Sequence, residues 1–395
     1  AREDRRGTLA AVRAALRTAG DLAATAASLE LRASIAARCA DPLLRFAPLG
    51  LTARALLEVE ELYRRILWAP REAGPGAAVE GTGPGHERRL REEARRVGAR
   101  RREPAFGTAD LPAVLGRTVL VEFVRAGDAL TAVTVRDGRC RRFELAPYPE
   151  LARELRFARL AATRALMDGG PEREAFAPLR GWFAEVLAEV AGRDVVIAPA
   201  GELHGMPWAA LVEEPFSVVP SAAAWVSAVT APPREGPVVP IAGAGAPHAA
   251  AEIRAVREIY GPSAAGPGAL QRARVVHFAG HGTYRADDPL LSGLVTERGT
   301  VTGYELAGIG GAPELVVLSA CDAGRGRDAV GIPGQLLALG VRTVIASVLP
   351  VDDARAVEFM AAVHRDLAAG SRPAEALAGA GREPGTLGFQ CFGAG

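Results

Sequence analysis

Two short segments of the chain each end a run of apolar, β-branched residues with a side chain that can react. The first, RVVHFAGHG at Arg274 to Gly282, ends at His281, and the second, ELVVLSACDAG at Glu314 to Gly324, carries Cys321. A continuous apolar run bounded by glycine is typical of a strand buried on both faces, as in a parallel sheet. Because the carboxyl ends of such strands meet at one edge, we expect His281 and Cys321 to lie close together.

A thiol beside an imidazole can perform nucleophilic catalysis. An isolated thiol has a pKa of roughly 8.5 and is mostly protonated at neutral pH. A neighbouring histidine can take that proton, which leaves a thiolate able to attack a peptide carbonyl, and can later protonate the leaving amine. Taken alone, Cys321 is typical of a small buried hydrophobic residue, but the histidine segment and the SACDAG turn favour a nucleophile. We therefore predict a dyad of Cys321 as nucleophile and His281 as base.

The other histidine and cysteine residues lack such a setting. His277 stands four residues before His281, roughly 13 Å away in an extended strand at about 3.3 Å per residue. Both cannot serve one thiol, so His277 is predicted to be a buried, hydrogen-bonded residue. Cys39, Cys140 and Cys391 have no paired or metal-ligand spacing and are predicted to be small buried residues. No metal site and no other cofactor is expected.

The two segments resemble motifs of the CHAT family of caspase-like cysteine peptidases. The resemblance extends to ASVLPVDDARA at Ala346 to Ala356, and to IAPAGELHGMPWAAL at Ile197 to Leu211 with a later Ser221-Ala222. It covers roughly residues 105 to 395. It implies an α/β fold in which a caspase-like, mostly parallel sheet has flanking helices.

The resemblance also implies a division of the chain. A non-catalytic, caspase-like subdomain is expected at residues 104–236, and a catalytic one at residues 237–395. Residues 1–103 are expected to be a helical N-terminal region, because apolar and alanine positions recur at helical spacing up to about residue 70. These helices are either degenerate tetratricopeptide-like repeats or a plain helical cap. The Gly/Pro-rich residues 72–86 are typical of a linker, and the charged run that follows is typical of a solvated helix.

Short sequence patterns within the two expected subdomains predict particular hairpins, helices and a turn. Gly127-Asp128 and Asp137-Gly138 separate strand-like runs and predict hairpins. Helices are expected at about residues 149–168 and 171–190, and the first is expected to turn inward Leu151, Leu155, Leu160 and Ala162. Gly243-x-Gly245 lacks the third glycine of a dinucleotide-binding loop, so a tight strand-to-helix turn is expected instead.

The resemblance implies roles for further residues. Backbone N–H groups of Gly282 and Cys321 would form an oxyanion hole. A carboxylate would hold a basic P1 side chain, and Asp353 occupies the place where the related separases carry an acidic residue. Asp352 could serve instead, and Asp322 is a weaker third candidate. Alternatively, Asp352 or Asp353 caps the helix that follows, or one of them caps the helix while the other binds the P1 side chain.

Composition limits the classes of function. The chain has 395 residues and a net charge of +1, which argues against general attraction to nucleic acid. No apolar run reaches the length of a membrane-spanning helix, and no signal-peptide pattern follows the charged start, so a cytoplasmic protein with no direct nucleic-acid or membrane partner is expected.

We predict a cysteine endopeptidase that cuts a protein partner. The resemblance implies a bacterial enzyme regulated in defence or cell death, with an activator protein acting on the N-terminal helices. Two alternatives stay open. One is a non-catalytic scaffold of the same fold, and the other is an amide hydrolase that acts on small molecules with the same dyad.

Overall fold

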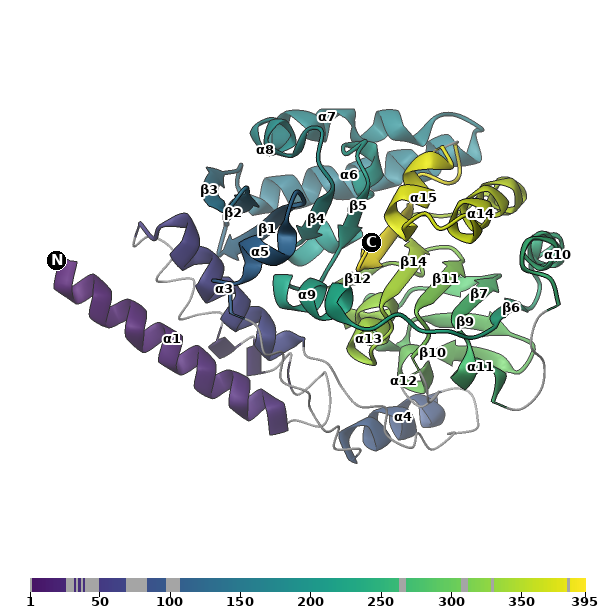
Figure 1. The fold of residues 1–395 in the computed structure, drawn as a ribbon, viewed down its shortest axis with the longest axis horizontal. Helices are drawn as coiled ribbons and strands as arrows, with labels where there is room; N and C mark the ends of the chain where they lie inside the picture. Colours follow the sequence, from purple (N-terminus) through teal and green to yellow (C-terminus); the bar gives the residue numbers. More distant parts are fainter. Residues whose placement is uncertain are drawn as a thin grey trace.

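A computed structural model describes residues 2–25, 32, 35–36, 38–39, 50–68, 84–96, 107–262, 268–306, 312–327, 330–381 and 384–395. A ten-stranded sheet runs through its centre (Figure 1). The strands follow the order β3 (Arg139–Glu144), β2 (Ala129–Arg136), β1 (Val119–Ala126), β4 (Val195–Ala198), β5 (Phe216–Val218), β15 (Phe389–Gly393), β14 (Thr343–Ser347), β11 (Leu315–Ser319), β7 (Val275–Ala279) and β6 (Val238–Ala242).

The sheet is mostly parallel, as the sequence predicts. Strands β1, β4 and β5 are parallel neighbours, and so are β14, β11, β7 and β6. The last strand, β15, lies between these two groups, parallel to β5 and antiparallel to β14. It therefore joins the strands expected in the non-catalytic and catalytic subdomains into one sheet.

The two predicted hairpins are present at the β3 edge of the sheet. Strand β1 turns into β2 at Gly127-Asp128, and β2 turns into β3 at Asp137-Gly138. Asp137 has φ of 48° and Gly138 has φ of 76°. Two central residues with positive φ define the type I′ turn, whose twist matches that of the paired strands.

Register shows which side chains share a face of the sheet. Paired positions place on one face Val344, Phe392, Val218, Ile197 and Val121. These belong to one continuous apolar core that also packs against α6 (Tyr148–Met167), α7 (Ala177–Arg180), α8 (Ala184–Val190) and α13 (Ile332–Ala338). The opposite face is covered by α3 (Ala53–Leu67), α5 (Leu111–Leu115) and α9 (Ala222–Thr230) over one half, and by α10 (Ala249–Tyr260), α14 (Asp353–Ala368) and α15 (Pro373–Gly379) over the other. Helices on both faces bury both sides of the sheet.

Two sequence predictions for the helices are wrong. Leu160 is not directed inward but is 68% exposed, because α6 packs through Leu151, Leu155 and Ala162 one or two helical turns apart. The second expected helix is interrupted, as η2 (Glu172–Phe176), α7, η3 (Gly181–Phe183) and α8 follow one another. Pro178 has no backbone N–H to donate, and Gly181 has a low helix propensity.

Two small sheets flank the carboxyl ends of β7 and β11. The first contains β8 (Gly282–Thr283), β9 (Gly293–Thr296) and β10 (Gly299–Thr302), and it follows His281 directly. The second contains β12 (Gly326–Arg327) and β13 (Val330–Gly331), and it follows the turn that carries Cys321. Shorter helices in this half are α11 (Ala269–Arg272) and α12 (Gly303–Leu306).

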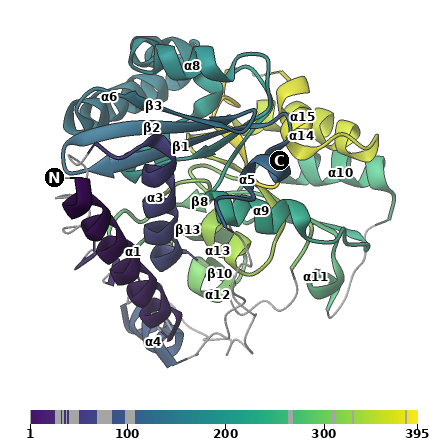
Figure 2. The same cartoon turned by 60° about the vertical axis from the view of Figure 1, so that its left-hand side comes forward.

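The N-terminal region is helical where it is described. Helix α1 (Arg2–Thr25) packs along α3 through an apolar seam that includes Leu16 and Ile66, and both helices lie on one side of the sheet (Figure 2). Helix α4 begins at Pro84, so the last three residues of the predicted linker are helical, as suits proline at a first helical position. The rest of that linker lies outside the described residues.

Helix α3 docks on the sheet through buried charges that the sequence did not reveal. The Arg64 guanidinium, 4% exposed, lies 2.8 Å from the Glu60 carboxylate and 3.4 Å from the fully buried carboxylate of Glu122. Arg64 also donates to the carbonyl oxygens of Phe123 at 2.6 Å and Pro220 at 2.9 Å. Burial raises the pKa of Glu122 well above its ordinary value, with a further contribution from Glu61. One arginine thus ties the N-terminal helices to the sheet.

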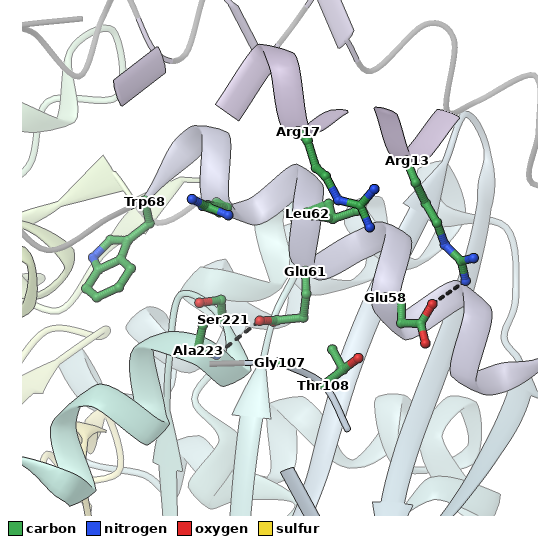
Figure 3. A pocket seen from close by; sticks show the side chains of 11 residues that line it. Arg13, Arg17, Glu58, Glu61, Leu62, Trp68, Gly107, Thr108, Ser221 and Ala223 are labelled. Carbon is green, nitrogen blue, oxygen red and sulfur yellow. Dashed lines mark hydrogen bonds and ion pairs between the residues drawn. The ribbon is translucent and has the colours of Figure 1, made fainter. Parts of the chain in front are cut away.

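A polar cavity of about 440 Å³ lies between α1, α3 and the start of α9 (Figure 3). Arg13 and Arg17 of α1 point toward it, and Arg13 forms an ion pair with Glu58 of α3. Glu61 accepts hydrogen bonds from the backbone N–H groups of Ala222 and Ala223, at 2.7 and 3.0 Å, and so caps α9. The N-terminal helices therefore present a charged cavity beside the sheet.

None of the helices in the described ranges combines the length and apolarity needed to cross a membrane.

Candidate active site

The structure brings the two predicted segments together at one edge of the sheet. Strands β7 and β11 pair in parallel, with Ala279 opposite Ser319, and the Gly280 N–H donates to the Ser319 carbonyl at 3.0 Å. His281 and Cys321 each follow two residues beyond that last pair. A Cβ placed on Gly282 would lie only 2.3 Å from the Cys321 carbonyl oxygen. The backbones that carry the imidazole and the thiol are therefore in direct contact, and only glycine fits at this point.

In this arrangement each side chain is bonded to another partner. His281 Nε2 lies 3.0 Å from the carbonyl oxygen of Gly245, in the turn between β6 and α10. Because a carbonyl only accepts, Nε2 carries a proton here. The Cys321 Sγ accepts from the Val351 N–H at 3.3 Å. Within the described ranges, no hydrogen bond joins the thiol to the imidazole. With Nε2 donating to Gly245, Nδ1 is the ring nitrogen that can accept the thiol proton, so proton transfer requires Nδ1 and the Cys321 thiol to come within hydrogen-bond distance.

The surroundings of Cys321 favour the protonated thiol. Burial is the main effect that raises the pKa of this thiol above its ordinary value, and the nearby carboxylates of Asp353 and Asp322 raise it further. The Val351 N–H acts in the opposite direction because it stabilises the thiolate. A thiol in this state needs a base before it can attack a carbonyl.

The three candidate carboxylates have different surroundings. Asp352 is the N-cap of α14, and its side chain accepts from the backbone N–H groups of Ala354 at 3.0 Å and Arg355 at 3.2 Å. The capping alternative therefore applies to Asp352. Asp353, the first residue of α14, lies close enough to Cys321 to raise the pKa of the thiol.

Asp322 is held by two arginines. Its carboxylate lies 3.3 Å from Arg159 Nη2 and 3.6 Å from Arg325 Nη1. Its φ of 53° is in the left-handed region, which few residues other than glycine, asparagine and aspartate adopt. These contacts neutralise the carboxylate and weaken the case for Asp322 as a site for a basic substrate side chain.

His277 is a buried, hydrogen-bonded residue, as predicted. Its Nδ1 lies 2.9 Å from Nε2 of His364, and its Nε2 lies 2.9 Å from the Glu252 carboxylate. His364 Nδ1 is 3.2 Å from the Tyr260 hydroxyl. Burial, with a smaller contribution from His277, lowers the pKa of His364 well below its ordinary value. This chain of polar groups links β7 to α10 and α14.

The remaining cysteines agree only in part with the prediction. All four cysteines are free, but only Cys391, in the middle of β15, is fully buried, and burial raises the pKa of its thiol to about 12. Cys39 and Cys140 are partly exposed. In the parts of the chain that the structure describes, no group of histidine, cysteine and acidic residues is arranged to hold a metal ion.

Sequence reasoning missed Arg159, which reaches the turn after Cys321 from helix α6. Along the sequence it is one arginine among several in a helix whose other arginines are exposed, so no local pattern distinguishes it. Gly201 to Gly205, the GELHG part of the resemblance, forms a 3₁₀ helix, η4, that packs against β12. Arg159 donates to the carbonyl oxygen of Gly205. The residues expected in the non-catalytic subdomain therefore touch the nucleophile turn.

The fold and the paired strand ends define an α/β protein of the caspase-like type. The model of the CHAT domain family matches residues 172–383, and the chain therefore belongs to the CHAT family. No curated protein matches the sequence.

Solved structures of similar fold are chains in crystal structures of the Saccharomyces cerevisiae separase–securin complex, at 2.6 and 3.0 Å resolution. The TM-scores are 0.52 and 0.53, with sequence identities of 9% and 10%. Each match covers 91% of this chain and 37% of the other, so this chain spans about a third of the length of those structures. The likeness concerns the fold.

Proposed function

We propose that the chain is a cysteine endopeptidase that cuts a protein partner through Cys321 and His281. The observation that supports the proposal is the close approach of Gly282 to the Cys321 carbonyl, because Gly282 directly follows His281 and the contact is with Cys321 itself. Cys321 supplies the nucleophile, and His281 accepts its proton and returns it to the leaving amine. The N–H groups of Gly282 and Cys321 are the proposed donors to the oxyanion, where each donor contributes about 3–4 kcal/mol to transition-state stabilisation.

We also propose that the peptidase activity is regulated through the N-terminal region, and two contacts support this. Arg91 of α4 lies 2.9 Å from Asp288, in the segment that follows His281. At the end of α3, the Trp68 indole N–H donates to the Gly334 carbonyl of α13 at 3.1 Å. The N-terminal region thus contacts the chain beyond both proposed catalytic residues.

An activator protein that binds the N-terminal helices, for example at the cavity of Figure 3, would act through these contacts to bring His281 Nδ1 and the Cys321 thiol within hydrogen-bond distance. A cytoplasmic role in bacterial defence or cell death is part of the proposal and is supported by the family resemblance.

To test the proposal, the chain is incubated with candidate partner proteins, including those encoded beside it in its genome. Discrete fragments with sequenced new termini are expected. The same preparations are treated with iodoacetamide, and alkylation of each cysteine is followed by mass spectrometry. The proposal is contradicted if no candidate is cut and Cys321 is alkylated no faster than the partly exposed Cys140.

That negative outcome would favour the second candidate function, a non-catalytic scaffold of the same fold. The raised pKa of the Cys321 thiol, and the contact of its sulfur with Val351 and not with His281, are the observations in its favour.

We further propose that Asp353 selects a basic P1 side chain. Asp353→Asn is expected to lower cleavage after arginine or lysine at least about 10-fold relative to cleavage after an apolar residue, since a charged pair is lost. The measurement is kcat/KM for a peptide library varied at P1. Asp352→Asn is the matched control, because asparagine caps a helix as well as aspartate does, and it should leave the preference unchanged. An apolar P1 preference in both the unmodified chain and Asp353→Asn would refute this assignment.

A further inference from the structure

Arg159 joins three separate segments at the nucleophile turn. It belongs to α6, and its guanidinium donates from Nη1 to the Gly205 carbonyl of η4. From Nη2 it donates to the Val348 carbonyl, just past the end of β14, at 2.8 Å, and to Asp322 Oδ1 at 3.3 Å. Its side chain is only 15% exposed.

We propose that Arg159 is a positioning residue that fixes the turn carrying Cys321 and neutralises the carboxylate of Asp322 beside the thiol. The proposal rests on the proposed function, since it concerns the same nucleophile, but the evidence for it is the guanidinium geometry.

The shape of the turn explains why a fixed partner is needed. Asp322 directly follows Cys321 and has positive φ, a conformation that costs energy for a residue with a side chain. An ion pair to a partly buried arginine that is itself anchored to two carbonyl oxygens holds that conformation. A planar fork with several donors suits this role, whereas a lysine could not reach all three acceptors at once.

Charges around the thiol make the electrostatic role testable. Two carboxylates face Cys321, that of Asp322 on its own turn and that of Asp353 from α14. Arg159 and Arg325 both pair with Asp322, and the Arg325 guanidinium also stacks 3.9 Å from the centre of the Tyr284 ring. If Arg159 is removed, one of the two cations that offset Asp322 is lost, and the thiolate becomes less favourable.

The experiment measures the rate of Cys321 alkylation by iodoacetamide from pH 6 to 10 in the full chain. Cys39, Cys140 and Cys391 serve as internal references by peptide mass spectrometry. For Arg159→Gln we expect the Cys321 profile to move to higher pH by roughly 0.5–1 unit, so that the rate near pH 7.5 falls about 3- to 10-fold. The double variant Arg159→Gln/Asp322→Asn should return toward the unmodified profile, because no uncompensated carboxylate remains.

Three further variants complete the design. Arg159→Lys should retain most of the unmodified pH profile, because it keeps a positive charge beside Asp322 even though it cannot bond all three acceptors. Arg164→Gln is the matched control, since Arg164 lies in the same helix, is 78% exposed and pairs only with its neighbour Asp168 among the described residues, so it should change nothing. Asp322→Asn alone should move the profile to lower pH, since asparagine tolerates positive φ and the charges of Arg159 and Arg325 are then no longer offset by the Asp322 carboxylate. This last arm tests the proposal even if Arg159→Gln fails to fold.

The possible outcomes distinguish failure of this proposal from failure of the peptidase proposal. An unchanged Cys321 profile in folded Arg159→Gln, a failure of the second substitution to restore it, or no shift in Asp322→Asn would each overturn the positioning role. Alkylation needs no substrate, so a chain that cuts nothing can still show the predicted shifts. Equally, if the chain cuts proteins but the pH profile of Cys321 alkylation does not depend on Arg159, the proposed function stands and this inference is wrong.

Discussion

Replacement of Cys321 by alanine is expected to abolish cleavage of a confirmed protein substrate, with a fall in kcat of about 10⁴-fold or more. The reason is that alanine has no nucleophile, and the covalent route is lost entirely. Folding should be retained, because the half-buried side chain loses one sulfur atom and the strand pairing of β7 with β11 does not involve it. The measurements are fragment formation and the thermal unfolding midpoint.

Two companion variants make this result specific. Cys140→Ala is the matched control, since Cys140 is a partly exposed free thiol in β3 and its loss should leave cleavage intact. His281→Ala should lower kcat by about 10²- to 10⁴-fold, the usual contribution of a general base. Because a nucleophile and its base act as a unit, the double variant should be no less active than Cys321→Ala alone. Continued cleavage by Cys321→Ala would end the peptidase proposal.

Replacement of Arg64 by methionine is expected to lower the free energy of unfolding by about 3–5 kcal/mol, the usual cost of breaking a buried ion pair. Methionine has a similar length but no donors, so the Phe123 and Pro220 carbonyls lose their hydrogen bonds from Arg64. The fully buried carboxylate of Glu122 loses its nearby cation at the same time. The measurement is urea unfolding of both chains at pH 7.5.

The exposed ion pair of Arg156 with Glu202 supplies the control, and Arg156→Met should cost less than about 1 kcal/mol. Adding Glu122→Gln to Arg64→Met should recover part of the loss, because it removes the buried charge that was left without a partner. A loss within 1 kcal/mol of that of the control, or no recovery in the double variant, would show that α3 does not dock through this cluster.

The strands that position the candidate site could be predicted from the sequence. The apolar runs at β7 and β11, the Asp137-Gly138 hairpin and the turn at Gly245 each depend on neighbours in the sequence, since strand period and turn conformation are local properties. The parallel arrangement follows from the alternation of such runs with helices. These local signals were sufficient to predict that His281 and Cys321 follow the carboxyl ends of strands in one sheet.

The partners of individual side chains were decided by the tertiary structure. His281 bonds Gly245, 36 positions earlier in the sequence, and Arg159, one of the two arginines that pair with Asp322, lies 163 positions earlier. Leu160 is exposed because the packing of α6, and not its hydrophobicity alone, decided which face turned inward. Asp352 and Asp353 are chemically identical neighbours, and only the direction in which α14 begins makes one the cap and leaves the other near the thiol.

The sequence by itself therefore determined which residues end the strands, because periodicity and glycine turns act over a few residues. The tertiary structure alone decided which atoms each reactive group touches, because a hydrogen bond or ion pair depends on the mutual placement of elements far apart in the chain.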